Sequence, residues 1–285
     1  MRKPPWLKKR IPPFQEVEKI RSILEQTDLH TVCQEARCPN LAECFAGGTA
    51  TFLILGRICT RACGFCAVER GAPAPSDEAE PERVSQAVRK MGLHYAVVTS
   101  VTRDDLVDGG ASSFAKTIQA IRALNPETKI EVLIPDFKGD QNSLKTVLKE
   151  RPEILNHNIE TIRRLYPRVR PQADYERSLN LLKTSKDDYP HIATKSGLML
   201  GFGETPEEVL EVLRDLREAG CDFLTIGQYL QPRQDRLPVI RFIPPEEFEE
   251  YKRIVEGMGF RAVASGPFVR SSFHASEMFK TIEVQ

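Results

Sequence analysis

Three cysteines lie close together at Cys59, Cys63 and Cys66, and no other stretch constrains the chain as strongly. The apolar, β-prone run 51–55 comes shortly before them, so we expect a strand that delivers three thiols to a tight loop. Thiolates are the usual ligands of iron–sulfur clusters, and a four-iron cluster has four iron corners. The spacing therefore predicts a cluster with three bound irons and a fourth that is open to a small molecule.

Two other uses of these thiols compete with this prediction. A disulfide framework is disfavoured because a triplet leaves one thiol over and the 285-residue chain is no short secreted scaffold. Zinc is a fairer competitor, but its sites usually show paired Cys-x2-Cys units with four ligands. The order Cys-x3-Cys-x2-Cys, with the aromatic Phe65 before its last cysteine, resembles the radical S-adenosylmethionine superfamily. The resemblance implies that the open iron chelates S-adenosylmethionine and that one electron then releases a 5′-deoxyadenosyl radical.

A second cysteine triplet comes earlier in the chain, at Cys33, Cys38 and Cys44. Six of the seven cysteines thus fall in the first quarter of the chain, in two groups of three. Core cysteines placed at random would not group in this way, so we expect a second cluster site that also lacks a fourth cysteine. On chemistry alone His274 is favoured over Ser271 as its fourth ligand, because imidazole is the commoner iron ligand.

The composition narrows the class of protein. Hydrophobic residues make up 41% and charged residues 28%, which is ordinary for a globular chain. No apolar run approaches the ~20 residues that a membrane helix needs. Lysine plus arginine equals aspartate plus glutamate at 40 each, which argues against a general attraction to nucleic acid or to a membrane surface. The start of the chain lacks the pattern of a signal peptide, so we expect a cytoplasmic protein with reduced cysteines, although a plastid or mitochondrial origin stays open.

From residue 51 onward, strand and helix patterns alternate. Six strands are predicted, at 51–55, 95–101, 129–134, 154–158, 193–200 and 221–228. Helices are predicted at 14–27, 81–91, 113–124, 143–149, 175–183, 205–219 and 246–256. This alternation without a nucleotide-binding glycine signature predicts the α/β class, as a partial (β/α)6 barrel of the TIM-like kind. In such barrels the chemistry lies on loops after the carboxyl ends of strands, where the later triplet falls.

Polar side chains gather after the second predicted strand. Thr99, Ser100 and Arg103 are candidates to bind the amino-acid end of S-adenosylmethionine. The plainer interpretation is an ordinary loop whose residues 108–110, Asp-Gly-Gly, turn into the next helix.

Two further loops carry candidates. Asn158 and Glu160 follow the fourth predicted strand and have groups suited to ribose hydroxyls. Lys195 lies inside an apolar strand, where an unpaired ammonium is costly, so it needs a ligand carboxylate or a neighbouring acid. The isolated Cys221 is predicted to be a small buried hydrophobic residue.

Over nearly its whole length the chain resembles the lipoyl synthase family. The two triplets carry most of this resemblance, together with Arg-Ser-Ser-x-x-Ala at 270–275. Supporting stretches are 3–6, 99–110, 156–161, 195–204 and 228–232. The sequence departs from the family at Phe273, Arg236 and Phe242, where tyrosine, histidine and tyrosine are frequent.

The resemblance implies two [4Fe–4S] clusters and S-adenosylmethionine as cofactors. The later triplet would bind the radical-generating cluster, and the earlier triplet an auxiliary cluster with Ser271 as fourth ligand, in place of His274. Sulfur from the auxiliary cluster would enter carbons six and eight of a protein-bound octanoyl chain, which makes the implied enzyme a sulfurtransferase of lipoate biosynthesis and protein lipoylation. The implied segments are 1–50 with the auxiliary triplet, 51–230 as the barrel, and 231–285 as an extension that closes the barrel and supplies the serine.

The resemblance also implies partners. These are octanoylated lipoyl domains of 2-oxoacid dehydrogenases or the glycine cleavage carrier protein, an electron donor such as flavodoxin or ferredoxin, and a cluster-repair carrier, with no nucleic acid and no membrane. Other readings stay open at this point: another radical sulfur-inserting enzyme such as one resembling biotin synthase, a non-catalytic iron–sulfur electron carrier, or a zinc-stabilised binding module.

Overall fold

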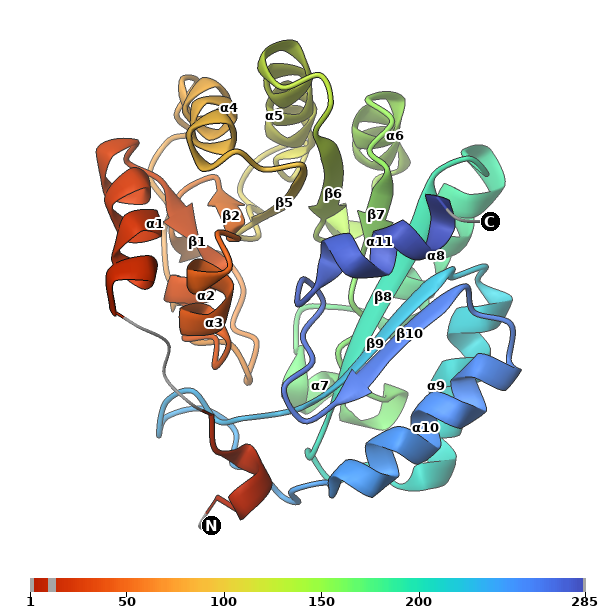
Figure 1. Ribbon diagram of the computed structural model, residues 1–285. Coiled ribbons are helices and arrows are strands. Elements are labelled where there is room, and N and C mark those ends of the chain that lie inside the picture. Colours follow the sequence, from red (N-terminus) through yellow and green to blue (C-terminus); the bar gives the residue numbers. More distant parts are fainter. Residues whose placement is uncertain (1–2, 10–13, 284–285) are drawn as a thin grey trace. The chain divides into compact units, whose positions relative to one another are not determined.

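The computed structural model describes residues 3–9 and 14–283 (Figure 1). The chain divides into two compact units. The N-terminal unit comprises Arg10–Ala62 and Ala67–Leu155, and the C-terminal unit comprises Met1–Lys9, Cys63–Cys66 and Asn156–Gln285. The predicted division into the segments 1–50, 51–230 and 231–285 stays a prediction. Residues 1–2, 10–13 and 284–285 lie outside the described residues.

The sheet of the N-terminal unit brings its strand ends together. Its strands follow the order β1 (His30–Thr31), β2 (Thr51–Ile54), β5 (Tyr95–Ser100) and β6 (Lys129–Leu133). Only β1 is antiparallel to its neighbour, and Leu53, Thr99 and Leu133 lie opposite one another in the parallel register. The loops after β2, β5 and β6 therefore leave the same edge of the sheet. A separate parallel pair joins β3 (Ile58–Cys59) and β4 (Glu69–Arg70), and β7 (Ile154–Asn156) lies where the units divide.

Helices of this unit follow from local signals. They are α1 (Phe14–Gln26), α2 (Val32–Glu35), α3 (Leu41–Ala46), α4 (Glu80–Met91), α5 (Ala111–Leu124) and α6 (Gln141–Lys149), with a short 3-10 turn η2 (Phe137–Gly139). In α4, for example, Pro81 stands in the first turn, Val84 and Val88 are buried, and Gly92 ends the helix at φ +64°. Figure 1 shows α4, α5 and α6 side by side along β5 and β6.

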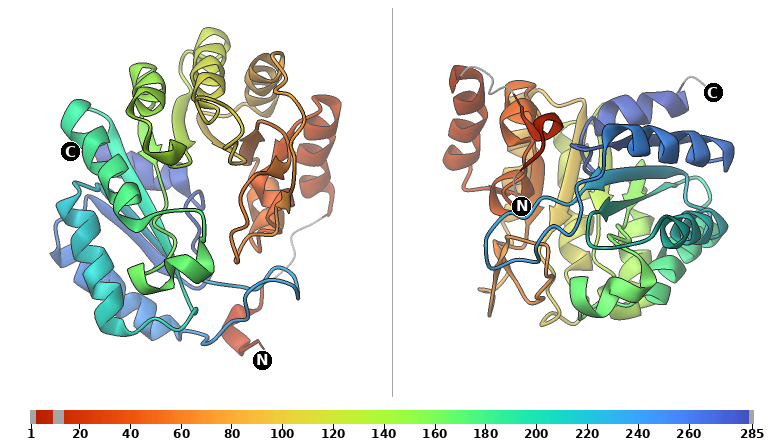
Figure 2. Two further views of the ribbon diagram at one scale, coloured as in Figure 1. Left: turned by 180° about the vertical axis from the view of Figure 1, so that it is seen from behind. Right: turned by 90° about the horizontal axis from the view of Figure 1, so that it is seen from below.

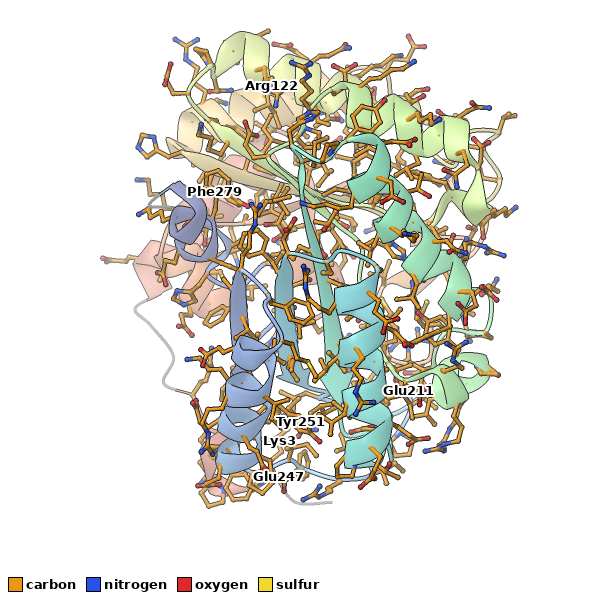
Figure 3. The ribbon with its side chains drawn as sticks, turned by 90° about the vertical axis from the view of Figure 1, so that its right-hand side faces the viewer. Lys3, Arg122, Glu211, Glu247, Tyr251 and Phe279 are labelled. Atoms are coloured by element: carbon orange, nitrogen blue, oxygen red, sulfur yellow. The ribbon has the colours of Figure 1, made fainter. Side chains whose placement is uncertain are left out.

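The C-terminal unit has three parallel strands in the order β8 (Ala193–Leu200), β9 (Phe223–Gln228) and β10 (Ala262–Gly266). Its helical segments are η1 (Pro5–Leu7), η3 (Arg163–Leu165), α7 (Tyr166–Val169), α8 (Tyr175–Asp188), α9 (Pro206–Glu218), α10 (Pro245–Gly257) and α11 (Ala275–Glu283). Figure 2 shows α8, α9 and α10 on one side of these strands, and in Figure 3 α9 with Glu211 and α10 with Tyr251 run next to each other.

The best-defined helix of this unit is α9. Thr205 and Glu208 form the reciprocal capping box that the sequence predicts, and Pro206 occupies the first turn. Its apolar stripe is buried in the core and comprises Val209, Val212, Leu213 and Leu216. Burying such side chains stabilises the fold by roughly 1.5–3 kcal/mol each relative to exposure.

The six predicted strands and seven predicted helices are confirmed within two residues at each end, except that α8 extends five residues beyond its predicted end at 183. The predicted α/β class with parallel strand–helix units is confirmed as well. The short strands β1, β3, β4 and β10 and the helices α7 and α11 were not predicted. The strand β10 reads Ala-Val-Ala-Ser-Gly, and small residues give little strand signal. None of the helices in residues 3–9 and 14–283 combines the length and apolar character that a membrane span requires.

Candidate functional site

The loop that carries Cys59 is joined to the loop after β5. The Cys59 Sγ atom accepts hydrogen bonds from the backbone N–H of Arg61 at 3.4 Å and of Thr102 at 3.3 Å. Thr60 donates its backbone N–H and its hydroxyl to the Thr102 carbonyl, at 3.0 and 2.9 Å, and its hydroxyl accepts the N–H of Asp104. The sulfur therefore sits in a backbone conformation that two loops determine together.

Arg61 extends this connection to a third loop. Its guanidinium binds both carboxylate oxygens of Asp104, at 2.7 and 2.9 Å, and one oxygen of Asp136 at 2.6 Å. Asp136 follows β6 and also accepts the N–H of Lys138. Burial by itself would lower the pKa of Arg61, but the hydrogen bonds to Asp104 and Asp136 outweigh it and hold the pKa above its ordinary value. This guanidinium stays charged.

The turn between β2 and Cys59 is held by a buried acid. Leu55 adopts φ +68°, which is uncommon for a residue with a side chain, and its N–H donates to Glu80 Oε2 at 2.7 Å. Burial raises the pKa of Glu80. Gly110 adopts φ +92°, which favours glycine, and a Cβ atom there would lie 2.3 Å from Leu55 Cδ1, so the Leu55 side chain would have to move. Both Glu80 and Gly110 therefore support the conformation from which the cysteine loop departs.

Cys63 and Cys66 belong to the C-terminal unit, whereas Cys59 belongs to the N-terminal unit. The Cys66 N–H donates to the Cys63 carbonyl at 3.2 Å, which closes a tight turn. Between them Gly64 donates to the Val169 carbonyl at 2.9 Å and accepts from the Leu237 N–H at 3.0 Å. Phe65, the predicted aromatic of the motif, packs half-buried against the core of this unit.

The earlier triplet lies on two short helices. Cys33 is buried in α2, Cys44 lies in α3, and Cys38 lies in the connection, which accords with the predicted loop or short helix. Arg37 at φ +53° turns the chain so that the Cys38 N–H donates to the Cys33 carbonyl at 3.0 Å. Burial raises the pKa of the Cys33 thiol to about 11, and the neighbouring Cys38 adds to this. A metal bound there would displace the proton, because the thiolate is the ligand.

Three predicted residues come together in the C-terminal unit: Asn158, Glu160 and Ser271. The Asn158 amide donates to Glu160 Oε1 at 3.1 Å and to Ser271 Oγ at 3.3 Å. Glu160 has φ +66°, and burial raises its pKa against the opposing charges of Arg170 and Arg270. Their predicted roles as ribose and cluster ligands stay predictions.

The alternative ligand His274 has a different setting. Its Nδ1 lies 2.8 Å from Glu277 Oε1 at the start of α11, and its side chain is about half exposed. Ser271 instead stands on a segment that approaches β9 closely. A Cβ atom on Gly227 would lie 2.1 Å from the Val269 carbonyl oxygen, so this approach requires glycine.

The other predicted contacts to S-adenosylmethionine are dispersed. The Thr99 hydroxyl donates to the Leu133 carbonyl at 2.9 Å, so it serves the sheet. The buried Ser100 hydroxyl has no hydrogen-bond partner within the described chain. Arg103 is buried and binds Asp105 at 2.9 and 2.8 Å, which lowers the pKa of that carboxyl. Lys195 is fully buried within β8.

Two structural predictions are confirmed. Asp108 accepts hydrogen bonds from Gly110 and Ser112 and so forms the turn into α5. Cys221 is fully buried, and its thiol contacts the Phe223 carbonyl at 3.2 Å. Sequence reasoning missed Arg61 and Asp136 as residues of the site, although a charged residue inside the cysteine loop was a usable signal.

The donor set fits iron–sulfur clusters. All seven cysteines are free thiols. Within the described part of the chain, no three His, Cys, Asp or Glu side chains are grouped as ligands of one metal ion. A four-iron cluster makes a different demand, because each thiolate binds an iron of its own and the sulfurs stand further apart. Two sets of three free thiols, one with a serine hydroxyl available elsewhere in the chain, match that chemistry.

Comparison with known proteins gives the family. The model of the Radical SAM superfamily matches residues 53–216, and that of the N-terminal domain of lipoyl synthase of the Radical SAM family matches residues 1–38. A lipoyl synthase of Caldicellulosiruptor saccharolyticus is 56% identical over 281 residues, covering 99% of both chains. One of Chlorobaculum parvum is 55% identical over 284 residues, covering 99% of this chain and 96% of its own.

A solved structure shows the fold independently. The [FeFe]-hydrogenase maturase HydG matches 85% of this chain and 64% of its own with a TM-score of 0.56, at 16% identity. At that identity the likeness concerns the fold alone. The family follows from the matched models and from the full-length similarity to the two relatives: the chain belongs to the lipoyl synthase family of the radical S-adenosylmethionine superfamily.

Proposed function

We propose that the chain inserts two sulfur atoms, at carbons six and eight, into an octanoyl chain bound to a carrier protein. The observation that carries this proposal is the presence of two sets of three free thiols in a chain that is similar over its full length to lipoyl synthases. The family membership makes S-adenosylmethionine and two [4Fe–4S] clusters its cofactors.

The residues divide between the two cofactor sites. Cys59, Cys63 and Cys66 would hold the cluster that binds S-adenosylmethionine. That pair of cofactors supplies the strong hydrogen acceptor that attack on an unactivated C–H bond needs and that no side chain provides. Asn158 and Glu160, and the loop residues Thr99, Ser100, Arg103 and Lys195, remain candidates to orient S-adenosylmethionine.

The sulfur donor would be held by the earlier triplet. Cys33, Cys38 and Cys44 supply three thiolates, and Ser271 the fourth ligand. An alkoxide is a harder ligand than a thiolate, so it suits an iron that must be given up when sulfur leaves. The hydrogen bond from Asn158 keeps the serine oxygen in place when it is not on iron.

The substrate is an octanoylated carrier protein. We propose lipoyl domains of 2-oxoacid dehydrogenases or the glycine cleavage carrier protein, with flavodoxin or ferredoxin as electron donor, a cluster-repair carrier, and a cytoplasmic location. Another sulfur-inserting radical enzyme, such as one resembling biotin synthase, is disfavoured by the earlier triplet and by the matched relatives.

The decisive experiment uses protein loaded anaerobically with iron and sulfide and an octanoylated carrier domain. We expect about eight irons per chain, release of 5′-deoxyadenosine, and a mass gain of the carrier by two sulfurs. Cys59→Ala should abolish both products. Cys38→Ala should retain 5′-deoxyadenosine release and lose the mass gain, and Cys221→Ala should retain both. Wild-type protein that holds one cluster, with the earlier triplet metal-free, would contradict the proposal.

A further inference from the structure

Three loops that leave one edge of a sheet meet at a single side chain, Arg61. The loop after β2 carries Arg61 itself, the loop after β5 contributes Asp104, and the loop after β6 contributes Asp136. Arg61 and Asp136 are almost completely buried, with side-chain exposures of 4% and 0%. Such a charged set, shielded from solvent, fixes its partners more firmly than an exposed ion pair would.

Each carboxylate partner is itself fixed by further contacts. Asp104 donates its N–H to the Thr60 hydroxyl at 3.0 Å, and its carbonyl accepts from Lys138 Nζ at 2.9 Å. The η2 turn after Asp136 contains three positive φ angles, at Phe137, Lys138 and Gly139, and a Cβ atom on Gly109 would lie 3.0 Å from the Phe137 ring. The positions of the two carboxylates around the guanidinium are therefore fixed by directed contacts and by the backbone, and not by charge attraction alone.

The set acts on the nearest thiol. Arg61 supplies the 3.4 Å N–H to Cys59 Sγ, and Thr102, which Thr60 binds twice, supplies the 3.3 Å N–H. Hydrogen bonds to the ligand sulfurs, and the net charge around a cluster, are two of the factors that set its reduction potential. The guanidinium and two carboxylates together carry a net charge of +1 − 2 = −1.

We propose that Arg61 is a positioning residue that sets the reduction potential of the cluster bound through Cys59. It holds the two N–H groups on the sulfur, which favours the reduced cluster, and it offsets one of the two carboxylates, of which Asp136 is buried and Asp104 partly exposed. The inference rests on the proposed function in one respect, namely that Cys59 is a ligand of the cluster that binds S-adenosylmethionine.

Arg61→Gln removes a positive charge and Asp136→Asn removes a negative one, so the proposal predicts shifts of the reduction potential in opposite directions. A merely structural role of the two residues would not predict this. Reduction adds one electron to the cluster, so a lost positive charge or a lost N–H···S bond disfavours it. Arg61→Gln should therefore shift the midpoint potential to a more negative value. Asp136→Asn removes a negative charge while Asp104 still binds the guanidinium by two bonds, so it should shift the potential to a less negative value.

The experiment is a redox titration of the loaded protein, followed by the electron paramagnetic resonance signal of the reduced cluster, with iron content measured in parallel. The earlier triplet is removed by a Cys38→Ala background so that one cluster is observed. Release of 5′-deoxyadenosine by Arg61→Gln should fall roughly 10- to 100-fold, as for other residues that orient metal ligands. Arg61→Lys keeps the charge but loses the bidentate contact with Asp104. Its rate of 5′-deoxyadenosine release should therefore lie between those of the wild type and Arg61→Gln.

The matched control is Arg122→Gln. Arg122 lies in the last turn of α5 and binds the carbonyls of Glu150 and Arg151, away from the cysteine loop in the chain. It should leave the potential unchanged. Shifts of Arg61→Gln and Asp136→Asn in the same direction, or an unshifted potential in an Asp136→Asn protein with full iron, would overturn the proposal. If wild-type protein releases no 5′-deoxyadenosine, the proposed function itself fails instead.

Discussion

The loop around Cys59 and the segment around Ser271 are held in contrasting ways. The Cys59 sulfur accepts two amide N–H groups, and the loop beside it is tied by Thr60 and by the buried Arg61 to two other loops. The Ser271 oxygen is held by one side-chain hydrogen bond, from Asn158 at 3.3 Å, which is long for such a bond. A ligand that must persist through turnover gains from the first arrangement. Under the proposed function, a ligand that must leave its iron gains from the second.

The contrast extends to how each backbone is shaped. Around Cys59, strain at Leu55 is supported by the carboxylate of Glu80, so the polar contacts determine the conformation. Around Ser271, the close approach of the chain to Gly227 determines it. The polar network around Cys59 should keep its shape when one contact is lost. In contrast, a single methyl group added at Gly227 would displace the segment that carries Ser271.

The largest effect that would sharpen this contrast is expected from Gly227→Ala. The new Cβ atom would lie 2.1 Å from the Val269 carbonyl oxygen, so the segment up to Ser271 must move. We expect sulfur insertion to fall roughly 10- to 100-fold while 5′-deoxyadenosine release continues, since the Cys59 loop is untouched. The measurement is the ratio of the two products under single-turnover conditions.

Gly257→Ala is the control for that variant. Gly257 ends α10, and a Cβ atom there would have no atom within 4 Å. Alanine in a helix stabilises it relative to glycine by roughly 0.5–1 kcal/mol, so thermal stability should rise slightly with unchanged products. Equal losses of both products in Gly227→Ala would indicate general unfolding and break the comparison.

A smaller effect is expected from Ser271→Cys. A fourth thiolate binds iron more firmly than the serine oxygen, so the cluster should be retained while sulfur transfer slows about tenfold. Mass spectrometry of the carrier, together with iron counts before and after one turnover, measures both quantities. Wild-type rates of lipoyl formation in this variant would show that a weakly held ligand is not needed. Ser271→Ala removes the proposed oxygen ligand altogether. It therefore distinguishes the effect of a weakly bound fourth ligand from the effect of having no fourth ligand.

The smallest effect concerns Lys9, near the start of the chain. Lys9 Nζ lies 4.6 Å from the centre of the Phe268 ring and 5.0 Å from that of Phe273, the two aromatic residues that flank Ser271. Lys9→Ala should lower the free energy of unfolding by about 0.5–1 kcal/mol and modestly reduce sulfur insertion. Chemical denaturation measures the first. The exposed neighbour changed in Lys8→Ala is the control, and an equal loss there would remove any special role for Lys9.

The sequence predicted the candidate ligands better than it predicted the residues that hold their loops in place. Thiol spacing is a local property, so both cysteine triplets could be identified without a structure. Strand and helix periodicity is also local, which is why most elements were predicted correctly. The set around Arg61 draws its members from three loops, and only the register of β2, β5 and β6 brings those loops to one edge.

The choice between Ser271 and His274 shows the same limit. General ligand chemistry favoured the imidazole, and the family resemblance favoured the serine. The surroundings differ in a way that no sequence pattern reports: Nδ1 of His274 lies against Glu277, whereas the Ser271 hydroxyl lies against Asn158, a residue over a hundred positions earlier. Such pairings arise from tertiary packing.

The cysteine motif is shared between the two units, and this has a consequence for biosynthesis. Gly64, between the second and third thiols, binds the backbone of Val169 and Leu237, which leave the ribosome long after it. The nascent motif therefore cannot adopt its finished shape while the later half of the polypeptide is still being translated. We therefore expect a cofactor held by this motif to be delivered only after Leu237 has been synthesised, rather than to a chain that has just produced the three cysteines.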